Sequence, residues 1–290
     1  MRYLRNQSLK KHTSFRIGGP TDYFCVPRNV EELKEALEFA KGRRLQIAVL
    51  GAGTNILALD RGFRGLVIKL GSGLNWIKIE GQKARVGAGV PLPKLIRKLT
   101  HKSLGGLEFL AGVPGSVGGA ITMNAGGWGK EIGPYVEEVK VLERDGSQKD
   151  IKGKKLGFGY RKSKLQGNPW IITEVTLRLR KKKKRVIEKR IKEYLSKRRA
   201  TQPLGIPNCG SVFKNPRGDF AGRLIEEAGC KGMRFGDAQI SAKHGNFIVN
   251  LGDAKAKDVI KLMTGIQKRV KDKFKILLEP EIKIMVKSPS

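Results

Sequence analysis

Two glycine-rich segments offer backbone that could bind an anionic ligand. Residues 105–126 read G-G-L-E-F-L-A-G-V-P-G-S-V-G-G-A-I-T-M-N-A-G, which is too rich in glycine for an ordinary helix and too apolar for a disordered linker. Residues 47–56 form an apolar run, I-A-V-L, that leads into the turn G-A-G-T-N-I. Backbone amides of such turns can hold phosphate oxygens. Together the two segments predict a large phosphate-bearing cofactor.

The first glycine turn does not fit the familiar nucleotide motifs. Gly51 and Gly53 lack the third glycine of a dinucleotide fingerprint, and no acidic residue follows at the expected distance. No segment reads G-x-x-x-x-G-K-S/T, so a nucleotide-triphosphate loop is excluded as well. Taken alone, these glycines fit a tight turn as well as a phosphate site. The second glycine segment is therefore what favours a cofactor site.

The chain of 290 residues carries a formal net charge of +33, from 59 Lys and Arg against 26 Asp and Glu. The basic residues are spread over the whole sequence, with one dense run at 181–185, and almost no aromatic residues lie among them. That distribution is typical of a solvated surface and not of a nucleic-acid reading face. The charge therefore favours anionic ligands, and we expect no specific nucleic-acid partner.

The three cysteines, Cys25, Cys209 and Cys230, are odd in number and widely spaced. Without a C-x-x-C pair they predict neither a disulfide framework nor a zinc site, so we expect no metal and a reducing compartment. No apolar stretch approaches the roughly 18 residues that a membrane span needs. The basic first residues are followed by no apolar segment, so no secretory signal is visible. These features predict a cytoplasmic protein without a membrane partner, and we expect a monomer.

The first part of the chain alternates short helices and strands. A helix N-capped by Asn29, with Glu32 in the capping-box position, is expected to end at Gly42, and a second helix spans 91–100. Two strands at 136–142 and 170–179 are expected with the charged turn E-R-D-G between them. Shorter strands are expected at 45–50, 66–70, 76–79 and 84–86. The fold class is therefore α+β.

A basic amphipathic helix over 181–199 marks the predicted domain boundary. Beyond it we expect a helix capped by Asp219 and closed by Gly229, and a longer helix over 253–273. Strands are expected at 246–251 and 276–286. The division is thus 1–180, with two α+β subdomains, and a smaller α+β domain over 181–290.

Many short motifs follow one another along the chain in the order of one known family. They are T-S-F-R-I-G-G-P at 13–20, L-G-A-G-T-N-I-L at 50–57, G-L-E-F-L-A-G-V-P-G-S-V-G-G-A at 106–120, M-N-A-G at 123–126, Y-R-K-S at 160–163, Q-P at 202–203, G-S-V-F-K-N-P at 210–216, K-H-G-N-F-I-V-N at 243–250 and L-E-P-E-I at 278–282. In these motifs the chain resembles, over nearly its whole length, the UDP-N-acetylenolpyruvoylglucosamine reductase, or MurB, family. Because 161–199 leaves no room for the tyrosine-bearing loop of longer members, it looks like the shorter type II form.

The resemblance implies an FAD-binding domain of the vanillyl-alcohol-oxidase, or PCMH, type, with 1–180 binding FAD and 181–290 binding substrate. NADPH is the implied reductant. The pyrophosphate of FAD is expected on the amides of the first glycine turn. The residues implied to hold FAD are Gly51, Ala52, Gly53, Thr54, Asn55, Ile56, Gly112, Pro114, Gly115, Ser116, Gly118, Gly119, Asn124, Ala125 and Gly126.

The implied reaction reduces an enolpyruvyl ether of UDP-N-acetylglucosamine to UDP-N-acetylmuramate, a peptidoglycan precursor. Three catalytic residues carry over from the family's motifs. Arg161 matches the arginine that binds the carboxylate, and Ser211 matches the proton donor. Glu281 matches the third residue, protonated or bonded to Arg161, with Glu279 on the same strand face as the alternative. Residues implied to contact the UDP-sugar or nicotinamide phosphates are Tyr160, Lys214, Asn215, Lys243, His244 and Asn246.

Two other functions share parts of this pattern. An FAD-dependent oxidase of the same fold would have the glycine segments without needing Arg161, Ser211 and Glu281. A basic nucleic-acid-binding protein would rest on the charge alone. One departure from the family is Cys209, where small residues are usual; it is either a filler or a thiol that makes the enzyme sensitive to alkylation.

Overall fold

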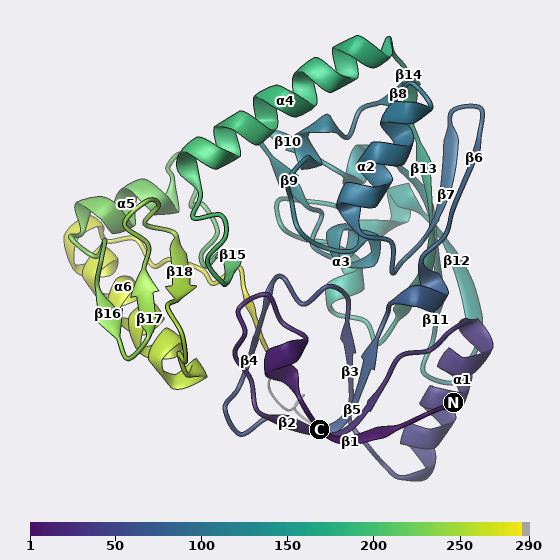
Figure 1. Ribbon diagram of the computed structural model, residues 1–290, viewed down its shortest axis with the longest axis horizontal. Helices are drawn as coiled ribbons and strands as arrows, with labels where there is room; N and C mark the ends of the chain where they lie inside the picture. Colours follow the sequence, from purple (N-terminus) through teal and green to yellow (C-terminus); the bar gives the residue numbers. More distant parts are fainter. Residues whose placement is uncertain (286–290) are drawn as a thin grey trace. The chain divides into compact units, whose positions relative to one another are not determined.

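The computed structural model describes residues 1–285; residues 286–290, which include the end of the strand expected over 276–286, lie outside the described part. The chain packs as two compact units (Figure 1). The first unit comprises Met1–Tyr3, Phe24–Ala52 and Val67–Arg198. The second comprises Leu4–Tyr23, Gly53–Leu66 and the chain from Arg199 onward. Within residues 1–285, every helix is too short or too polar to span a lipid bilayer.

A five-stranded antiparallel sheet forms the framework of the first unit (Figure 1). Side chains alternate along it: Val86, Val139 and Val175 are buried, whereas the residues that follow or precede them are charged or polar. The short helix α3 (Val117–Thr122) packs against two of the strands. In spatial order the strands are β12 (Gln148–Lys152), β11 (Val136–Leu142), β13 (Ile171–Arg178), β7 (Lys83–Gly87) and β6 (Ile77–Glu80).

The predicted turn at 143–146 exists, but it joins β11 to β12 and not to β13. The strand β12 reads Q-K-D-I-K, and only Ile151 in it is buried. A strand with one apolar side chain at a sheet edge lacks the alternating pattern by which strands are recognised. For that reason the sequence did not indicate β12.

Helix α1 (Val30–Gly42) begins and ends where the sequence predicted. The amide of Glu32 donates to Oδ1 of Asn29 at 2.8 Å, which confirms the N-cap. In a capping box the carboxylate of Glu32 would accept the amide of the N-cap residue, Asn29. Here it accepts the amide of Arg28 instead, at 2.8 Å, one residue before the N-cap. Helix α2 (Leu92–His101) follows Pro91 as expected, and α4 (Lys184–Thr201) contains the last residues of this unit.

Further strands form a four-stranded sheet and two pairs of two-residue strands. Strands β1 (Leu4–Ser8), β2 (Pro20–Cys25), β5 (Phe63–Lys69) and β3 (Ile47–Leu50) form a four-stranded sheet in that order, and the boundary between the units falls within β2 and β5. In the first unit, β8 (Leu104–Gly105) pairs with β14 (Arg180–Lys181), and β9 (Gly126–Gly127) pairs with β10 (Lys130–Glu131).

The second unit contains a four-stranded antiparallel sheet and two helices, α5 (Ala221–Glu227) and α6 (Ala256–Phe274). Helix α6 packs against two of its strands and against α5. In addition, β4 (Ile56–Ala58) pairs in parallel with β19 (Lys283–Met285). The sheet order is β15 (Asn208–Ser211), β18 (Phe247–Asn250), β17 (Ala238–Ile240) and β16 (Arg234–Phe235).

The compact units do not coincide with the predicted boundary at 180/181. Phe15, Ile17 and Leu57 are almost fully buried in the same hydrophobic core as Phe213 and Ile248 of the C-terminal part. Burial of such side chains is worth about 1.5–3 kcal/mol each, which explains why two N-terminal segments pack with the second unit. The assignment of 1–180 to FAD and 181–290 to substrate remains a prediction.

Three expected helix starts are wrong. Helix α4 begins at Lys184 and not at residue 181. The N-cap of α5 is Phe220, whose amide is bound by the carboxylate of Asp219 at 2.6 Å. Helix α6 begins at Ala256 and not at Asp253. The carboxylate of Asp60 accepts the amides of Ala256 and Lys257 at 2.8 and 3.1 Å, so a residue nearly 200 positions away supplies the cap.

Candidate active site

Arg161 lies at the tip of a tight two-residue turn. Gly159 and Lys162 exchange backbone hydrogen bonds of 3.0 Å on either side of Tyr160 and Arg161. Arg161 has a φ of +53°, which is uncommon for a non-glycine residue and is often found at functional sites. Its guanidinium donates to the carbonyl of Gly126 at 3.2 Å and lies 5.2 Å from the ring of Tyr160, which is 47% exposed. The turn thus presents an arginine and an aromatic ring together.

Asn124 holds this turn in place. It is completely buried with a φ of +44°. Its Nδ2 donates to the carbonyl of Gly159 at 2.9 Å and to the carboxylate of Glu131 at 2.6 Å, and its Oδ1 accepts the amide of Gly133 at 2.9 Å. The side chain that the resemblance implied for FAD is therefore engaged with three protein groups, one of them beside Arg161.

The two predicted cofactor segments meet in the first unit. A Cβ added to Gly51 would lie 2.3 Å from Oγ of Ser116, so a larger residue there would have to displace this hydroxyl. Ser116 is buried and N-caps α3, where its Oγ accepts the amide of Gly119 at 3.4 Å. Within residues 1–285, the amides of Gly51, Gly115 and Ser116 donate to no protein group. Such amides can bind an anion.

Other glycines of these segments serve packing. The amide of Gly118 donates to the carbonyl of Ala88 at 2.8 Å, and a Cβ there would lie 3.0 Å from that of Ala88. At Gly126 a Cβ would lie 2.2 Å from the carbonyl of Lys130, and the amide of Ala125 is bound by Ala120. Gly112, Pro114 and Gly119 are exposed, so the surface between the packed positions is open to a ligand.

The first glycine turn continues into the second unit. Gly53 has a φ of +68°, and a Cβ on it would lie 2.1 Å from the carbonyl of His12, so its glycine is required by packing. In the part of the chain that the structure describes, the amides of Ala52, Gly53 and Asn55 donate to no protein group. Thr54 lies between them, and Ile56 begins β4. Four amides from residues 51–55 are thus available for an anion.

Ser211 ends β15 beside a β-bulge. The register of β15 against β18 shifts between Asn208 and Ser211. Gly210 has a φ of +80° with open space around its α-carbon, so its glycine serves backbone conformation and not close approach. Cys209 is buried, and this burial raises its thiol pKa to about 12, with a smaller contribution from the charge of Glu281. Of the two alternatives for Cys209, this favours the small buried filler, since reactive cysteines are accessible thiolates.

The segment with the two candidate glutamates runs next to Ser211. The amide of Glu281 donates to the carbonyl of Val212 at 2.8 Å, and its carbonyl accepts Nδ2 of Asn55 at 3.2 Å. The neighbouring Glu279 has a side chain 70% exposed that binds Nζ of Lys214 at 2.5 Å. Glu281 is only half-exposed. The structure thus separates a surface carboxylate, Glu279, from Glu281, which is held next to the segment of Ser211.

The expected substrate contacts have clear structural partners in the second unit. Asn246 is buried, and its amide group exchanges hydrogen bonds with the backbone of Phe213 at 2.9 and 2.8 Å, which fixes the chain after Ser211. Nδ1 of His244 accepts the amide of Asn246 at 3.1 Å, and burial lowers the pKa of its imidazole. A separate group lies at the surface: Lys243 donates to the carbonyl of Arg199, and Oδ1 of the exposed Asn215 accepts the amide of Ala221.

Comparison with known proteins identifies the family. Residues 202–285 match the family model "UDP-N-acetylenolpyruvoylglucosamine reductase, C-terminal domain", and residues 21–152 match "FAD binding domain". A reductase of this name from Symbiobacterium thermophilum is 46% identical, over 99% of this chain and 94% of its own length. The chain belongs to the UDP-N-acetylenolpyruvoylglucosamine reductase family.

Further relatives of this reductase family agree. The Bacillus subtilis member is 41% identical over 97% of this chain and 93% of its own length. The crystal structure of the reductase (MurB) from Thermus caldophilus superimposes with a TM-score of 0.86 at 41% identity, over 98% of this chain and 99% of that one. The expected fold, an FAD-binding domain with a smaller C-terminal domain, is thereby confirmed. Neither the oxidase nor the nucleic-acid-binding alternative is favoured.

The candidate residues of this reductase-family chain divide between the two units. Arg161 and Tyr160 lie in the first, and Ser211 and Glu281 in the second. The individual roles carried over from the family therefore stay predictions. Two residues of the first unit, Trp128 and Arg198, lie beside the Arg161 turn and were not indicated by the sequence. Arg198 was hidden in a basic helix, and its burial is the signal that only the structure supplies.

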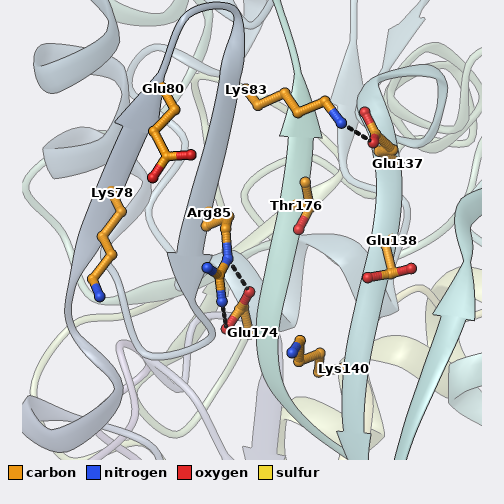
Figure 2. Close-up of a pocket in the computed structure, with 9 residues that line it drawn as sticks. All are labelled: Lys78, Glu80, Lys83, Arg85, Glu137, Glu138, Lys140, Glu174 and Thr176. Atoms are coloured by element: carbon orange, nitrogen blue, oxygen red, sulfur yellow. Dashed lines mark hydrogen bonds and ion pairs between the residues drawn. The ribbon is translucent and has the colours of Figure 1, made fainter.

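A hollow on the five-stranded sheet is a poor candidate for the reductase site (Figure 2). Charged side chains of opposite sign line it and bind one another across the strands. Arg85 binds Glu174 at 2.7 and 3.1 Å, and Lys83 binds Glu137 at 2.6 Å. This ionic face consists of Lys78, Glu80, Lys83, Arg85, Glu137, Glu138, Lys140, Glu174 and Thr176.

Proposed function

We propose that the chain is a UDP-N-acetylmuramate dehydrogenase, which reduces UDP-N-acetyl-3-O-(1-carboxyvinyl)-glucosamine to UDP-N-acetylmuramate with NADPH. The observation that carries this proposal is 46% identity to a reductase of this family over 99% of the chain. The product is a peptidoglycan precursor, so the chain serves cell-wall biogenesis and through it cell shape and division. We place it in the cytoplasm as a monomer.

The residues present fit FAD. The backbone amides of Gly51, Ala52, Gly53 and Asn55 can together neutralise a pyrophosphate without side chains, and those of Gly115 and Ser116 add a second set. The close approach of Gly51 to Ser116 brings the first residue of the glycine turn next to the second set. FAD held there would supply the hydride, taken from NADPH, for the terminal carbon of the enol ether.

The chain's own residues handle the charge and the proton. Hydride addition to the terminal carbon leaves an electron pair on the carbon beside the carboxylate. Arg161 binds that carboxylate through its planar fork and so stabilises the added charge. Ser211 then donates its hydroxyl proton to this carbon, which is a far stronger base than any side chain, so position matters more than acidity. Glu281 orients the carboxylate or Arg161 from the segment that Asn55 holds.

The two half-reactions test this assignment separately by stopped-flow absorbance of the flavin. Ser211→Ala should leave flavin reduction by NADPH unchanged and slow flavin reoxidation by the enol ether about 10²–10⁴-fold, the usual contribution of a positioned acid. Ser147→Ala, a surface serine on the turn between β11 and β12, is the matched control. Normal reoxidation in Ser211→Ala would remove the proton-donor role, and a wild-type protein without flavin would remove the proposed function.

A further inference from the structure

One arginine of an otherwise exposed basic helix is buried. Helix α4 contains eight Lys and Arg residues, and most of its side chains are exposed. Arg198, in its last turn, is only 8% exposed, whereas its neighbour Arg199 is exposed. Burial of a guanidinium is costly unless the surroundings compensate it. The burial of Arg198 therefore indicates a specific environment and not the general basicity of the chain.

The environment of Arg198 includes two backbone carbonyls, an aromatic ring and a glycine of the second glycine segment. Nε of Arg198 donates to the carbonyl of Ala111 at 2.9 Å, and a terminal nitrogen donates to that of Phe109 at 3.4 Å. The guanidinium lies 4.5 Å from the ring of Trp128. A Cβ added to Gly112 would lie 2.9 Å from Cδ of Arg198. Arg198 is thus held against the second glycine segment on one side and against the β9–β10 hairpin on the other.

The same hairpin connects Arg198 to Arg161. Gly126, in β9, accepts a hydrogen bond from Arg161, and Trp128, at the hairpin tip, contacts Arg198. The pKa of Arg198 is lowered to about 10, first by burial and then by the charge of Arg161. Arg198 therefore keeps its charge at neutral pH, and the charge of Arg161 lies close enough to act on it. An anion near both is attracted by both.

The backbone around the pair is conformationally restricted. Asn124, Trp128 and Arg161 all have a φ between +44° and +53° and belong to the two neighbouring hairpins that Asn124 ties together. Non-glycine residues in this region cost about 1–3 kcal/mol each and persist where the surroundings fix them. The guanidinium groups are thus placed before any ligand arrives, which is the condition for efficient electrostatic binding.

We propose that Arg198 and Arg161 form one two-arginine site for an anionic group, with Trp128 as its aromatic wall. The proposal rests on the proposed function, which supplies two sources of this chemistry near Arg161. One source is the carboxylate of the enol ether. The other is the negative charge that a flavin ring gains on reduction, since Arg198 contacts the glycine segment proposed to hold FAD. In either case Arg198 binds ligand directly in the reductase reaction.

Variants of the holoenzyme test the proposal. Arg198→Met removes the charge, Arg198→Lys keeps it without the planar fork, and Arg190→Met on the exposed part of the same helix is the matched control. Bound FAD and the melting temperature establish that each variant is folded. Arg198→Met also loses the hydrogen bonds to Phe109 and Ala111, which weakens the glycine segment. The role of the charge is therefore judged from the difference between Arg198→Met and Arg198→Lys. If Arg198→Met loses FAD, Arg198→Gln takes its place.

The first measurement is the flavin midpoint potential without substrate, taken against a reference dye. If the flavin is the source, Arg198→Met should shift the ratio of reduced to oxidised flavin at least tenfold toward the oxidised form, which corresponds to ~30 mV for two electrons. Arg198→Lys should recover most of this shift. A role limited to packing would not produce a difference that depends on charge.

The second measurement compares the dissociation constant of the enol ether with that of UDP-N-acetylglucosamine, which lacks the carboxylate. If the carboxylate is the source, Arg198→Met should raise the dissociation constant of the enol ether tenfold or more. The dissociation constant of UDP-N-acetylglucosamine should rise less than twofold. The proposal would be overturned if the flavin potential of Arg198→Met were unchanged and the two dissociation constants were either unchanged or changed by the same factor. It would also be overturned if Arg198→Lys behaved like Arg198→Met. Failure of the proposed function is distinct, since the wild type and Arg190→Met would then also lack enol-ether reduction.

Discussion

Two regions of the first unit use arginine in opposite ways. On the ionic face of Figure 2, four basic and four acidic residues line the sheet, so this patch is neutral in a chain of net charge +33. Arg85 there binds both oxygens of Glu174. Around the Arg161 turn, the hydrogen bonds of Arg161 and Arg198 instead include backbone carbonyls, those of Gly126, Ala111 and Phe109.

The difference lies in the charge of the acceptor. A carboxylate that accepts two parallel hydrogen bonds from a guanidinium neutralises its charge and occupies its fork. A carbonyl oxygen orients a guanidinium without carrying a formal charge of its own. The ion pairs in the hollow over the sheet are therefore a structural feature, whereas the arginines beside the two hairpins are the ones that we propose for a ligand.

The largest effect should come from neutralising one arginine in each region. Arg161→Met should lower kcat/KM about 10²–10³-fold, because it removes a group that stabilises charge gained in the transition state. Arg85→Met should leave kcat/KM within about twofold, although it uncouples a nearly buried Glu174 and so lowers stability. Steady-state NADPH oxidation with the enol ether, together with thermal melts, measures both. Similar losses of activity in the two variants would erase the distinction.

A smaller but informative effect is expected at Asn124. Asn124→Ala removes three hydrogen bonds and leaves the buried amide of Gly133 without its acceptor, at a cost of about 1–3 kcal/mol in the free energy of unfolding. Because the Arg161 turn loses its anchor at Gly159, we also expect about tenfold lower kcat. Chemical denaturation and turnover are the readouts, with the surface variant Ser147→Ala as control. A destabilised variant with normal kcat would show that Arg161 is placed by other contacts.

The sequence was informative where a structure depends on neighbours in the chain. The cap at Asn29, the helix end at Gly42 and the paired strands near 136–142 and 170–179 all follow from local patterns and are confirmed. The motif at 13–20 was found as well. Its burial in the C-terminal core was not predicted, because the sequence around Phe15 and Ile17 does not indicate which distant residues they pack against. The capping of α6 by Asp60 was missed for the same reason.

The site divides in the same manner. Arg161, Ser211 and Glu281 were named because short motifs surround them, and Asn124 was named as a cofactor residue on its motif, a role that stays a prediction. Its motif marks it as important, but only the structure reveals that its side chain binds Gly159, Glu131 and Gly133. Arg198 had no motif at all among the basic residues of α4. Burial and mutual position, which are properties of the fold, distinguish it.

The smallest expected effect is a pH dependence confined to the ionic face. Hydrogen bonds from Lys83 and Arg178 lower the pKa of Glu137, with the bond to Lys83 as the main cause. A carboxyl whose folded-state pKa is depressed contributes stability above its unfolded pKa of about 4.3, and this contribution disappears as the pH falls through the lower folded value. Melting temperatures of wild type and Glu137→Gln should therefore differ slightly at pH 7 and converge near pH 3. Because the pair is largely exposed, the difference should also shrink at high salt. The flavin potential, which depends on the other region, should be the same in both proteins; a shift in Glu137→Gln would mean that the two regions are electrostatically coupled.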